Sequence, residues 1–574
     1  MKLRIKKSRL YRIILIISAA LFMAGIAFGV VFSSVFLKSS YNEAETSYIK
    51  MNVNEFSFDP KIIEVVQGTK VIIDIVNVTT SDPEVFRQHT FTMGPPYNIH
   101  EVLEVGKTYR IEFIADKAGE FSFGCAVFCG TGHAAMKGKL IVKPKSEAEK
   151  IQEKDFLDIE EISSTLKILA EEEALPDSPE WGIDDFKYLM AVIQTEYPGG
   201  AIKIINTKTL SDLGDIKNVG NRVHVVEIPP GKRWIYSISR DGIVSKIDLF
   251  SMRVTRQIKV GKDSRGLAMS EDGKYLAAGN YNPNSLVILD SETLRPLSVI
   301  EATGINPDGM SVRSRIANVF GIDSQRLFAV NLKEAGQTWL IEQKPPFRIV
   351  RAFSAGRLLH EINALTEDER FIAVTSQEDN KYAVIDTLRM EKFKDINSSK
   401  TPHPGQGTLD TENNLWYGNS IKSANITLID TENMSLKGYV WPGGINASSG
   451  GGLFSSPVPP LKNVKYIVFD IIFGEHKGTL FFVDRKKAAA GELGAAPVVK
   501  TLGWKELGFE TPGRITHPEY SYDGKYLVVS GWDFNKIVVL DAGALPEARV
   551  VKTFDAVTPT GIFPMWRTDA KYLG

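Results

Sequence analysis

The stretch Val287-Ile288-Leu289-Asp290-Ser291-Glu292-Thr293-Leu294 decides the fold, because the chain repeats its pattern of an apolar strand, a polar residue and a turn. The residue in the place of Asp290 recurs at intervals of 42, 42, 52, 44, 44, 54 and 57 residues, at Asn206, Asp248, Asp290, Glu342, Asp386, Asp430, Asp484 and Asp541. Propeller blades of four strands repeat roughly every 40 to 45 residues, and closed propellers have about four to eight blades. The 574-residue chain is therefore predicted to be all-β, with residues 183–574 forming an eight-bladed β-propeller rather than an array of sandwiches.

The histidines of this region share one position in the repeat. That position is held by His224, His360, His403 and His517, and by Arg265 in another blade. In a propeller it belongs to the innermost strand or to the loop entering it, so these side chains are expected to face the central funnel. Each histidine alone could equally cap a strand without binding anything. As a set, these residues favour a cationic cavity on the axis of the propeller. His100 and His476 do not occupy the shared position of the repeat and are expected to be structural or exposed.

Both cysteines of the chain lie in the stretch Gly124-Cys125-Ala126-Val127-Phe128-Cys129-Gly130-Thr131-Gly132-His133-Ala134-Ala135-Met136. Two thiolates, an imidazole and a thioether form a soft ligand set, which suits copper. A disulfide, a structural zinc site and a single-copper centre are the alternatives. Zinc usually takes four Cys or His ligands, and a blue-copper centre uses one cysteine. The second cysteine favours two bridged coppers.

A further histidine ligand is expected from an earlier strand, where His89 lies in a region of alternating apolar residues. Short strands are expected around it, at residues 71–78, 109–114 and 139–142. Residues 46–144 are thus predicted to form a small β-sandwich. The charged stretch 145–182, whose apolar spacing suits a helix that ends before Pro176, is predicted to connect it to the propeller.

Residues 1–38 predict a membrane anchor. Basic side chains precede an uncharged run from Ile13 to Leu37, which is 25 residues long, and about 20 residues span a bilayer. A cleaved signal peptide has a shorter apolar core of about 7 to 15 residues, so an uncleaved single-pass transmembrane helix is favoured. Because the basic side stays in the cytoplasm, the folded domains are expected on the periplasmic side of the cytoplasmic membrane.

The charge of the chain excludes one class of partner. The 68 basic and 69 acidic residues give a formal net charge of -1. No basic block lies beyond the segment that flanks the predicted anchor, so nucleic-acid binding has no support.

Residues 46–144 resemble the binuclear copper (CuA) cupredoxin domains of cytochrome oxidase subunit II and nitrous oxide reductase. The resemblance implies a six-part ligand set in a binuclear copper centre. Its members are bridging Cys125 and Cys129, terminal His89 and His133, the weak axial thioether of Met136 and the backbone carbonyl of Val127.

Residues 183–574 resemble the haem d1 domain of cytochrome cd1 nitrite reductase. The motifs that carry this resemblance include Val223-His224, Ser239-Arg240-Asp241-Gly242, Ala278-Gly279-Asn280-Tyr281, Asn331-Leu332-Lys333-Glu334-Ala335-Gly336 and Thr401-Pro402-His403-Pro404-Gly405. The resemblance implies a non-covalent haem d1 whose iron is bound by His224. It also implies a pocket lined by Arg240, Arg265, Tyr281, His403 and Trp532.

Two departures from that family stand out. The chain has no C-x-x-C-H motif for a covalent c haem, and a copper domain takes the place of the family's cytochrome c domain. The family has two histidines over the iron; His360 matches one, and the other position is expected to fall on Asp323. A histidine can supply charge and a proton near neutral pH, whereas an ionised aspartate repels an anion.

These features predict a nitrite reductase that forms nitric oxide, with His360 and Asp323 at the catalytic position. Electrons would come from a soluble donor, such as a cytochrome c or a cupredoxin, and would enter at the copper centre. Two alternatives keep the haem: reduction of another small acceptor such as oxygen, and a non-catalytic role as a haem d1 carrier, assembly factor or electron-transfer protein.

Overall fold

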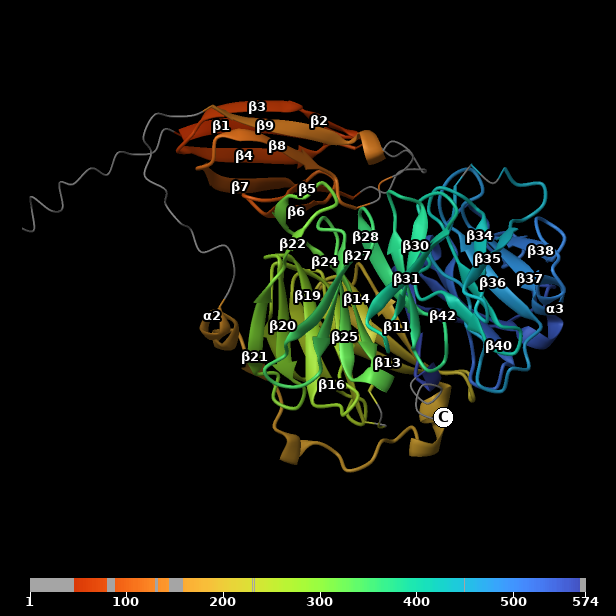
Figure 1. The fold of residues 1–574 in the computed structure, drawn as a ribbon. Helices are drawn as coiled ribbons and strands as arrows, with labels where there is room; N and C mark the ends of the chain where they lie inside the picture. The colour runs from red at the N-terminus through yellow and green to blue at the C-terminus, as the bar shows by residue number, and fades with distance from the viewer. Residues whose placement is uncertain are drawn as a thin grey trace, which may run out of the picture.

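The computed structural model describes residues 46–79, 88–127, 129, 133–143, 158–229, 231, 233–446, 448 and 450–567. The predicted membrane anchor at residues 1–38 lies outside them. Among the described residues, no helix is both long and apolar enough to span a membrane. Figure 1 shows a β-sandwich lying across one face of a propeller, so the prediction of an all-β chain with these two parts is confirmed.

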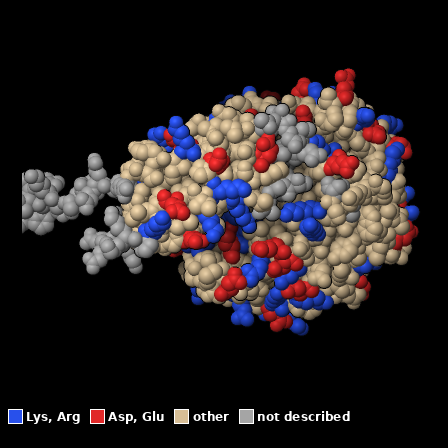
Figure 2. Space-filling view, turned by 90° about the horizontal axis from the view of Figure 1, so that it is seen from above, with Lys and Arg blue, Asp and Glu red and all other residues tan. Residues whose placement is uncertain are grey.

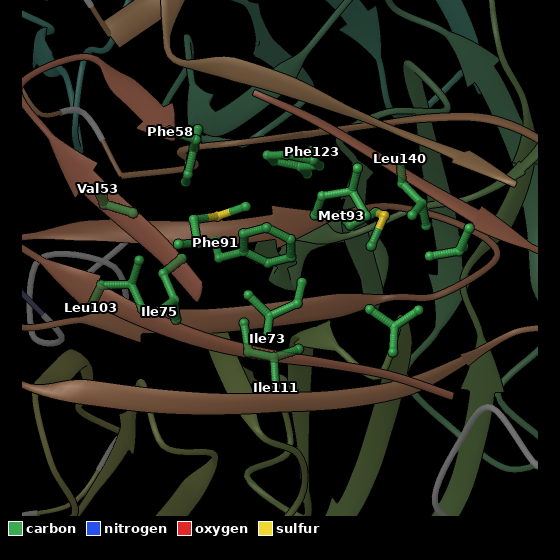
Figure 3. Close-up of a cluster of buried hydrophobic side chains, with 14 of the residues drawn as sticks. Val53, Phe58, Ile73, Ile75, Phe91, Met93, Leu103, Ile111, Phe123 and Leu140 are labelled. Atoms are coloured by element: carbon green, nitrogen blue, oxygen red, sulfur yellow. The ribbon is translucent and has the colours of Figure 1, made fainter. Parts of the chain in front are cut away.

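The sandwich consists of two sheets whose apolar side chains alternate inward. Its first sheet has the order β2-β1-β4-β7 and its second the order β3-β9-β8-β5-β6. The strands are β1 (Thr46–Asn54), β2 (Ser57–Asp59), β3 (Ile62–Val66), β4 (Thr69–Asn77), β5 (His89–Met93), β6 (Ile99–Leu103), β7 (Thr108–Ala115), β8 (Gly119–Gly124) and β9 (Lys137–Lys143). Ile73 and Ile75 of β4 meet Phe91 of β5 and Phe123 of β8 between the sheets (Figure 3).

In the described part of the chain, eight sheets form the blades of the propeller. The first four blades contain β11 (Leu189–Gln194), β12 (Ala201–Asn206) and β13 (Ser211–Lys217); β14 (Val223–Glu227), β15 (Trp234–Ser239), β16 (Ile243–Asp248) and β17 (Arg253–Lys259); β18 (Asp263–Met269), β19 (Tyr275–Asn282), β20 (Ser285–Asp290) and β21 (Pro296–Glu301); and β24 (Ile316–Ile322), β25 (Leu327–Leu332), β26 (Gln337–Glu342) and β27 (Ile349–Ser354). A hairpin of β22 (Thr303–Ile305) and β23 (Ser311–Arg313) projects between the third and fourth blades.

The other blades contain β28 (Leu359–Ala364), β29 (Phe371–Ser376), β30 (Lys381–Asp386) and β31 (Glu391–Asn397); β32 (Thr408–Asp410), β33 (Leu415–Gly418), β34 (Ile426–Asp430) and β35 (Ser435–Val440); β36 (Tyr466–Ile471), β37 (Thr479–Asp484) and β38 (Val498–Gly503); and β39 (Thr516–Tyr520), β40 (Tyr526–Gly531), β41 (Lys536–Asp541) and β42 (Val550–Asp555). The short helices in the propeller are η3 (Ile183–Tyr188), η4 (Asp323–Gln325), α3 (Arg485–Ala489), η5 (Trp532–Phe534) and η6 (Ala542–Ala544). The ring closes through β43 (Pro559–Pro564), which pairs antiparallel with β11 as the innermost strand of the first blade.

The seventh blade has three strands, because an irregular glycine-rich segment replaces its innermost strand. Ser455 makes a single antiparallel bridge to Phe469 of β36. A Cβ on Gly451 would lie 2.0 Å from the carbonyl oxygen of Ser420, and one on Gly452 would lie 2.0 Å from that of Asp470. These contacts exclude any larger side chain, so the glycines let the segment lie directly against its neighbours.

The connector between the two domains differs from the predicted helix. Its described part has a six-residue helix, α2 (Ile159–Ser164), followed by β10 (Lys167–Ile168) and η2 (Glu172–Ala174). Ile162 packs into the core of the propeller, and β10 adds a fifth strand to the edge of β17. The apolar residues are therefore spaced for docking on a blade and not for one long helix.

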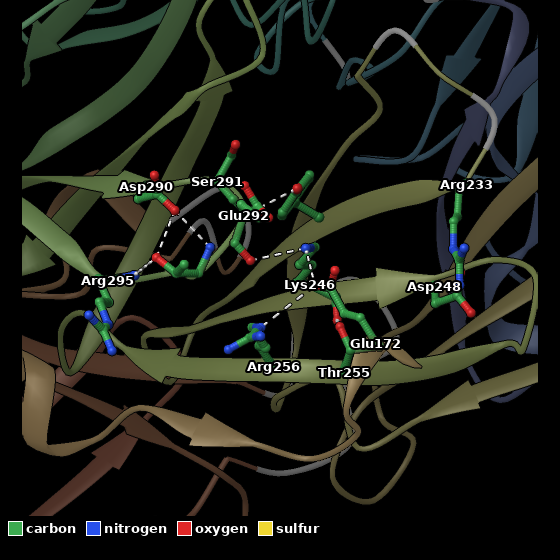
Figure 4. Close-up of polar contacts among 12 residues, drawn as sticks. Glu172, Arg233, Lys246, Asp248, Thr255, Arg256, Asp290, Ser291, Glu292 and Arg295 are labelled. Atoms are coloured by element: carbon green, nitrogen blue, oxygen red, sulfur yellow. Dashed lines mark hydrogen bonds and ion pairs between the residues drawn. The ribbon is translucent and has the colours of Figure 1, made fainter. Parts of the chain in front are cut away.

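A buried lysine fixes the end of this connector, as Figure 4 shows. The Nζ of Lys246 donates to Glu172 Oε1 at 2.8 Å and to the carbonyl oxygen of Glu292 at 3.0 Å. The ammonium also lies 4.1 Å from the centre of the Trp234 ring. Since a buried charge needs such partners, this cluster holds the connector on the second and third blades.

Acidic and basic side chains are interspersed on the face that Figure 2 shows from above, the side on which the sandwich lies. This distribution agrees with the nearly equal numbers of both charges in the sequence.

Candidate functional site

The cysteine loop lies at one end of the sandwich. His89 opens β5, Cys125 follows β8 directly, and His133 begins η1 (His133–Ala135) just before Met136 and β9. Because these strand ends meet in the same sheet, His89 and Cys125 face one another although they are 36 positions apart in the sequence. His89, Cys129 and Met136 are each 0% exposed, so the site is closed to water on this side.

The ligand atoms have spacings that suit a shared metal. Cys125 Sγ lies 3.9 Å from His89 Nδ1 and 3.0 Å from the carbonyl oxygen of Val127. Cys129 Sγ lies 3.5 Å from His133 Nδ1 and 3.7 Å from Met136 Sδ. Metal bonds of about 2.3 Å to sulfur and about 2.0 Å to nitrogen at a tetrahedral angle separate two ligands by ~3.5 Å. The donor set therefore fits soft metal ions without rearrangement.

The two thiols are electrostatically unequal. Burial opposes ionisation of Cys125, but contacts with Cys129, His133 and His89 lower its pKa well below the usual value. Contact with Cys125, together with burial, raises the pKa of Cys129. The Cys125 thiolate is thus favoured before any metal binds. A bound cation is required to keep both cysteines deprotonated.

The second candidate site is the funnel of the propeller, where innermost strands begin. His224 and His360 are the second residues of β14 and β28, and Arg265 is the third residue of β18. His403 precedes β32, and the bridge from Pro402 to Ser420 positions it. The shared repeat position thus places these four residues around one space.

His224 has the tautomer that metal binding needs. Its Nδ1 lies 2.7 Å from the backbone carbonyl oxygen of Arg265. A carbonyl oxygen can only accept, so Nδ1 carries the proton and Nε2 keeps its lone pair. Burial, with Arg240 and Arg265 nearby, also lowers the pKa of His224 well below its usual value. The imidazole is therefore neutral and oriented like a metal-binding histidine.

Two arginines lie beside His224, and one of them, Arg265, is paired with Asp263 at 3.0 Å between Nη2 and Oδ2. Burial and Arg265 lower the pKa of Arg240 to about 9. Arg265 is 6% exposed, and within the described chain its Nε has no hydrogen-bond partner. Its guanidinium lies 4.7 Å from the ring centre of Tyr281. These cations next to the Nε2 of His224 fit a metal cofactor that carries carboxylates, as a haem does.

His360 and His403 form a pair across the pocket. Their ring centres lie 4.7 Å apart. The Nδ1 atoms of both rings contact the same carboxylate oxygen, Oε1 of Glu361, at 2.8 and 2.9 Å. Burial opposes ionisation of Glu361, but the two imidazoles hold its pKa well below the usual range. Burial lowers the pKa of His360 to about 4 despite Glu361.

The expectation that Asp323 lies beside His360 is wrong. Asp323 follows the far end of β24, whereas Arg315, just before the start of that strand, lies 5.0 Å from the Tyr281 ring centre. Seven strand residues of about 3.3 Å each separate the two ends. The backbone N–H of Asp323 donates to Glu369 at 2.6 Å. The histidine that lies beside His360 is His403, which was predicted to line the haem pocket.

Other predicted residues have different surroundings. His517 Nδ1 accepts the backbone N–H of Ile562, and its ring stacks on Phe454 with centres 4.0 Å apart, so this histidine is held as part of the blade structure. Trp532 packs in a small apolar cluster, with the Arg514 guanidinium 4.1 Å from its ring centre.

Sequence reasoning missed two charged groups of the pocket. Glu361 directly follows His360, and Lys333 lies in the quoted Asn331–Gly336 motif. Lys333 is 6% exposed, and burial together with Arg315 lowers its pKa to about 7. The sequence did contain a signal for Glu361, because this carboxylate directly follows His360, a histidine at the shared repeat position.

The comparisons with known proteins identify both domains. The family model described as "Cytochrome D1 heme domain" matches residues 185–568, and the one described as "Cupredoxin-like domain" matches residues 25–142. The chain is 24% identical over 473 residues to a nitrite reductase of Stutzerimonas stutzeri, covering 75% of this chain and 83% of that protein.

A dihydro-heme d1 dehydrogenase of Pseudomonas aeruginosa is 27% identical over 330 residues, which are 56% of this chain. The chain spans 60% of that relative's length. The solved structure of dihydro-heme d1 dehydrogenase NirN in complex with DHE superimposes with a TM-score of 0.59 at 22% identity, over 74% of this chain and 84% of that one. That likeness shows the propeller fold.

Proposed function

Because the chain belongs to the cytochrome D1 heme domain family, we propose that it is an oxidoreductase that reduces nitrite to nitric oxide at a haem d1 in the funnel. His224 would bind the iron through Nε2, and Arg240 and Arg265 would pair with the haem carboxylates. Electrons would enter at a binuclear copper centre held by Cys125, Cys129, His89, His133, Met136 and the Val127 carbonyl. A bound haem d1 would supply one-electron reduction of nitrite in this pocket.

The pair of imidazoles on one carboxylate is the observation that carries this proposal. Reduction of nitrite takes one electron and two protons and releases nitric oxide and water. With Nδ1 of each ring in ion-pair contact with Glu361 Oε1, the Nε2 atoms of His360 and His403 would be the groups that take up and donate those protons. A carboxylate behind an imidazole stabilises its protonated form.

Anion binding and proton uptake are therefore coupled in this pocket. Without substrate, burial keeps His360 neutral. A bound nitrite, together with Glu361, raises the pKa of the imidazole, which then donates from Nε2 to the departing oxygen. Lys333 adds a buried amine that exchanges protons near neutral pH.

The test is anaerobic turnover of the purified, haem-loaded protein with a one-electron reductant and nitrite. Nitric oxide trapped in a 1:1 ratio to the electrons consumed supports the proposal. Protein that retains haem d1 and copper but forms no nitric oxide contradicts it.

A second function is favoured by one comparison, the 27% identity to dihydro-heme d1 dehydrogenase. In this case the funnel would bind dihydro-haem d1 as substrate, and two electrons and two protons would leave it. The copper centre would then carry electrons away from the pocket. Dihydro-haem d1 mixed with the oxidised protein would show this activity as the spectrum of haem d1 appears.

The predicted anchor and the periplasmic location complete the proposal. A soluble one-electron donor would reach the copper domain on that side of the membrane. Membrane fractionation of cells that produce the full chain, and a residue 1–38 deletion, would test the anchor.

A further inference from the structure

A continuous set of polar contacts links the cysteine loop to the funnel. It starts on β5, where the backbone N–H of Thr90 donates to Cys125 Sγ at 3.4 Å. Thr90 Oγ1 lies 3.0 Å from Thr92 Oγ1, two residues along the same face of the strand. Thr92 Oγ1 lies 2.8 Å from Nδ1 of His100, its partner across the pair β5–β6.

His100 carries this path across the domain boundary. Its Nε2 lies 2.6 Å from Asp263 Oδ2, and both side chains are nearly inaccessible, at 3% and 2% exposure. Arg265 Nη2 contacts the same carboxylate oxygen at 3.0 Å. The backbone carbonyl of Arg265 then accepts from Nδ1 of His224. The domains are thus joined at a buried ion-pair contact.

The part of this path inside the sandwich consists of hydrogen bonds. The Thr90 hydroxyl donates to Cys125 Sγ at 3.9 Å and accepts the backbone N–H of Ala126 at 2.7 Å. Across the domain boundary, His100 Nε2 and Asp263 Oδ2 meet as an ion-pair contact.

The sandwich and the propeller also meet on either side of this path. A cavity of about 410 Å³ lies next to the path and is lined from both sides, by Cys125, Ala126 and His100 of the sandwich and by Tyr281, Arg315 and Leu358 of the propeller. At the edge of the contact, Arg222 Nη2 lies 3.3 Å from Glu104 Oε1. The cysteine loop and the wall of the funnel are therefore immediate neighbours.

We propose that the contact between His100 and Asp263 docks the sandwich on the propeller and that the path Cys125–Thr90–Thr92–His100–Asp263–Arg265–His224 is the route of electrons between the two sites. The proposal rests on the proposed function. One electron leaves the reduced copper centre and reduces the ferric haem iron to ferrous. No bond of the path breaks and no proton leaves it. His100, expected from the sequence to be structural or exposed, is then a positioning residue.

Substitutions at two residues separate docking from conduction. His100→Leu removes both contacts of the imidazole, whereas His100→Gln keeps an N–H for Asp263 in place of Nε2. Thr92→Val breaks the path within the sandwich and leaves the contact between His100 and Asp263 in place. Thr69→Val, at a buried threonine of β4 outside the path, is the matched control.

The first measurement needs no cofactor. Small-angle scattering of the metal-free full chain should show a compact particle for the wild type, His100→Gln and Thr92→Val, and a separated sandwich for His100→Leu. Loss of a partner from a buried ion pair shifts the docking equilibrium by about a hundredfold or more. A compact His100→Leu particle would overturn the docking role.

The second measurement follows the electron in the holoprotein. The copper centre is reduced by a flash-activated one-electron reductant, and the haem absorbance is recorded with time. The rate should fall in Thr92→Val and His100→Leu and stay at the wild-type value in Thr69→Val, at an unchanged copper potential. Wild-type rates in Thr92→Val would overturn the route. A holoprotein that lacks either chromophore would contradict the proposed function instead, and the scattering result would still decide the docking role.

Discussion

Replacing Glu361 by Gln tests the proton-donating pair most directly. The substitution keeps the size of the side chain and its ability to accept a hydrogen bond but removes the charge that both imidazoles share. Oε1 lies 2.8 Å from His360 Nδ1 and 2.9 Å from His403 Nδ1. Two unit charges about 4 Å apart interact by about 4 kcal/mol at an effective dielectric constant of ~20.

Solvent reduces this value, because the His360 and His403 side chains are 22% and 17% exposed. Half of it, about 2 kcal/mol, is the stabilisation that the protonated His360 loses when the charge is removed. Because about 1.4 kcal/mol is a factor of ten, we expect kcat/KM for nitrite to fall about 30-fold. The haem content should stay unchanged.

The pH dependence has a definite sign. An imidazole must be protonated to donate, and burial puts the pKa of His360 in the free protein at about 4. Above that pKa the protonated fraction falls about tenfold per pH unit, so kcat/KM should decline with a slope of about −1 on a logarithmic scale. Glu361→Gln lowers the pKa of His360 further. It should therefore lower kcat/KM at every pH without changing the slope of its decline.

The assay is the initial rate of nitric oxide formation between pH 6 and 8, recorded with an electrode under argon. Glu369→Gln is the matched control, because Glu369 is also buried but accepts the backbone N–H of Asp323 at the far end of the blade. The reasoning is refuted if Glu361→Gln turns over at the wild-type rate, or if the control loses as much activity as Glu361→Gln does.

Three further predictions concern the copper ligands, the haem ligand and the connector. Cys129→Ser should abolish the electron spin resonance signal of a two-copper centre at an unchanged haem content; a retained signal would remove Cys129 from the ligand set. His224→Ala should lose haem during gel filtration while its circular dichroism stays like the wild type, and a haem-to-protein ratio near the wild-type value would contradict the assignment. Lys246→Ala should lower the free energy of unfolding in urea by about 2 kcal/mol, the worth of its hydrogen bonds to Glu172 and Glu292. The exposed Lys274→Ala, at an ion pair of 3.2 Å, should change it by less than about 1 kcal/mol.

The sequence repeat predicted most of the fold and about half of the funnel residues. This was possible because the repeated residue in the place of Asp290 indicates where the strands of each blade begin. That phase placed His224, Arg265 and His360 on the starts of innermost strands, where they lie. It also placed His517 there, but could not show that Ile562 and Phe454 already occupy its ring. The repeat predicts where a residue lies in its strand. It does not predict the partners of the side chain, because these come from the neighbouring blade.

The errors have the same physical origin. Asp323 was assigned from the family resemblance, but the pocket is formed by residues at or just before the starts of innermost strands, and Asp323 follows the end of one. The connector was predicted as one helix because its apolar residues recur at helical spacing, yet Ile162 and β10 find their partners on a blade. His100 lay outside the propeller phase since it belongs to the other domain, and no pattern within one domain predicts a contact with another.

The closure of the ring by β43 has a consequence for biosynthesis. The first blade takes its innermost strand, residues 559–564, from the far end of the chain, and β11 pairs with it from Met190 to Gln194. Until the ribosome has released those residues, β11 presents an unpaired edge on which other strands can aggregate. The first blade, which opens the ring, therefore gains its innermost strand only after the other seven blades have been synthesised.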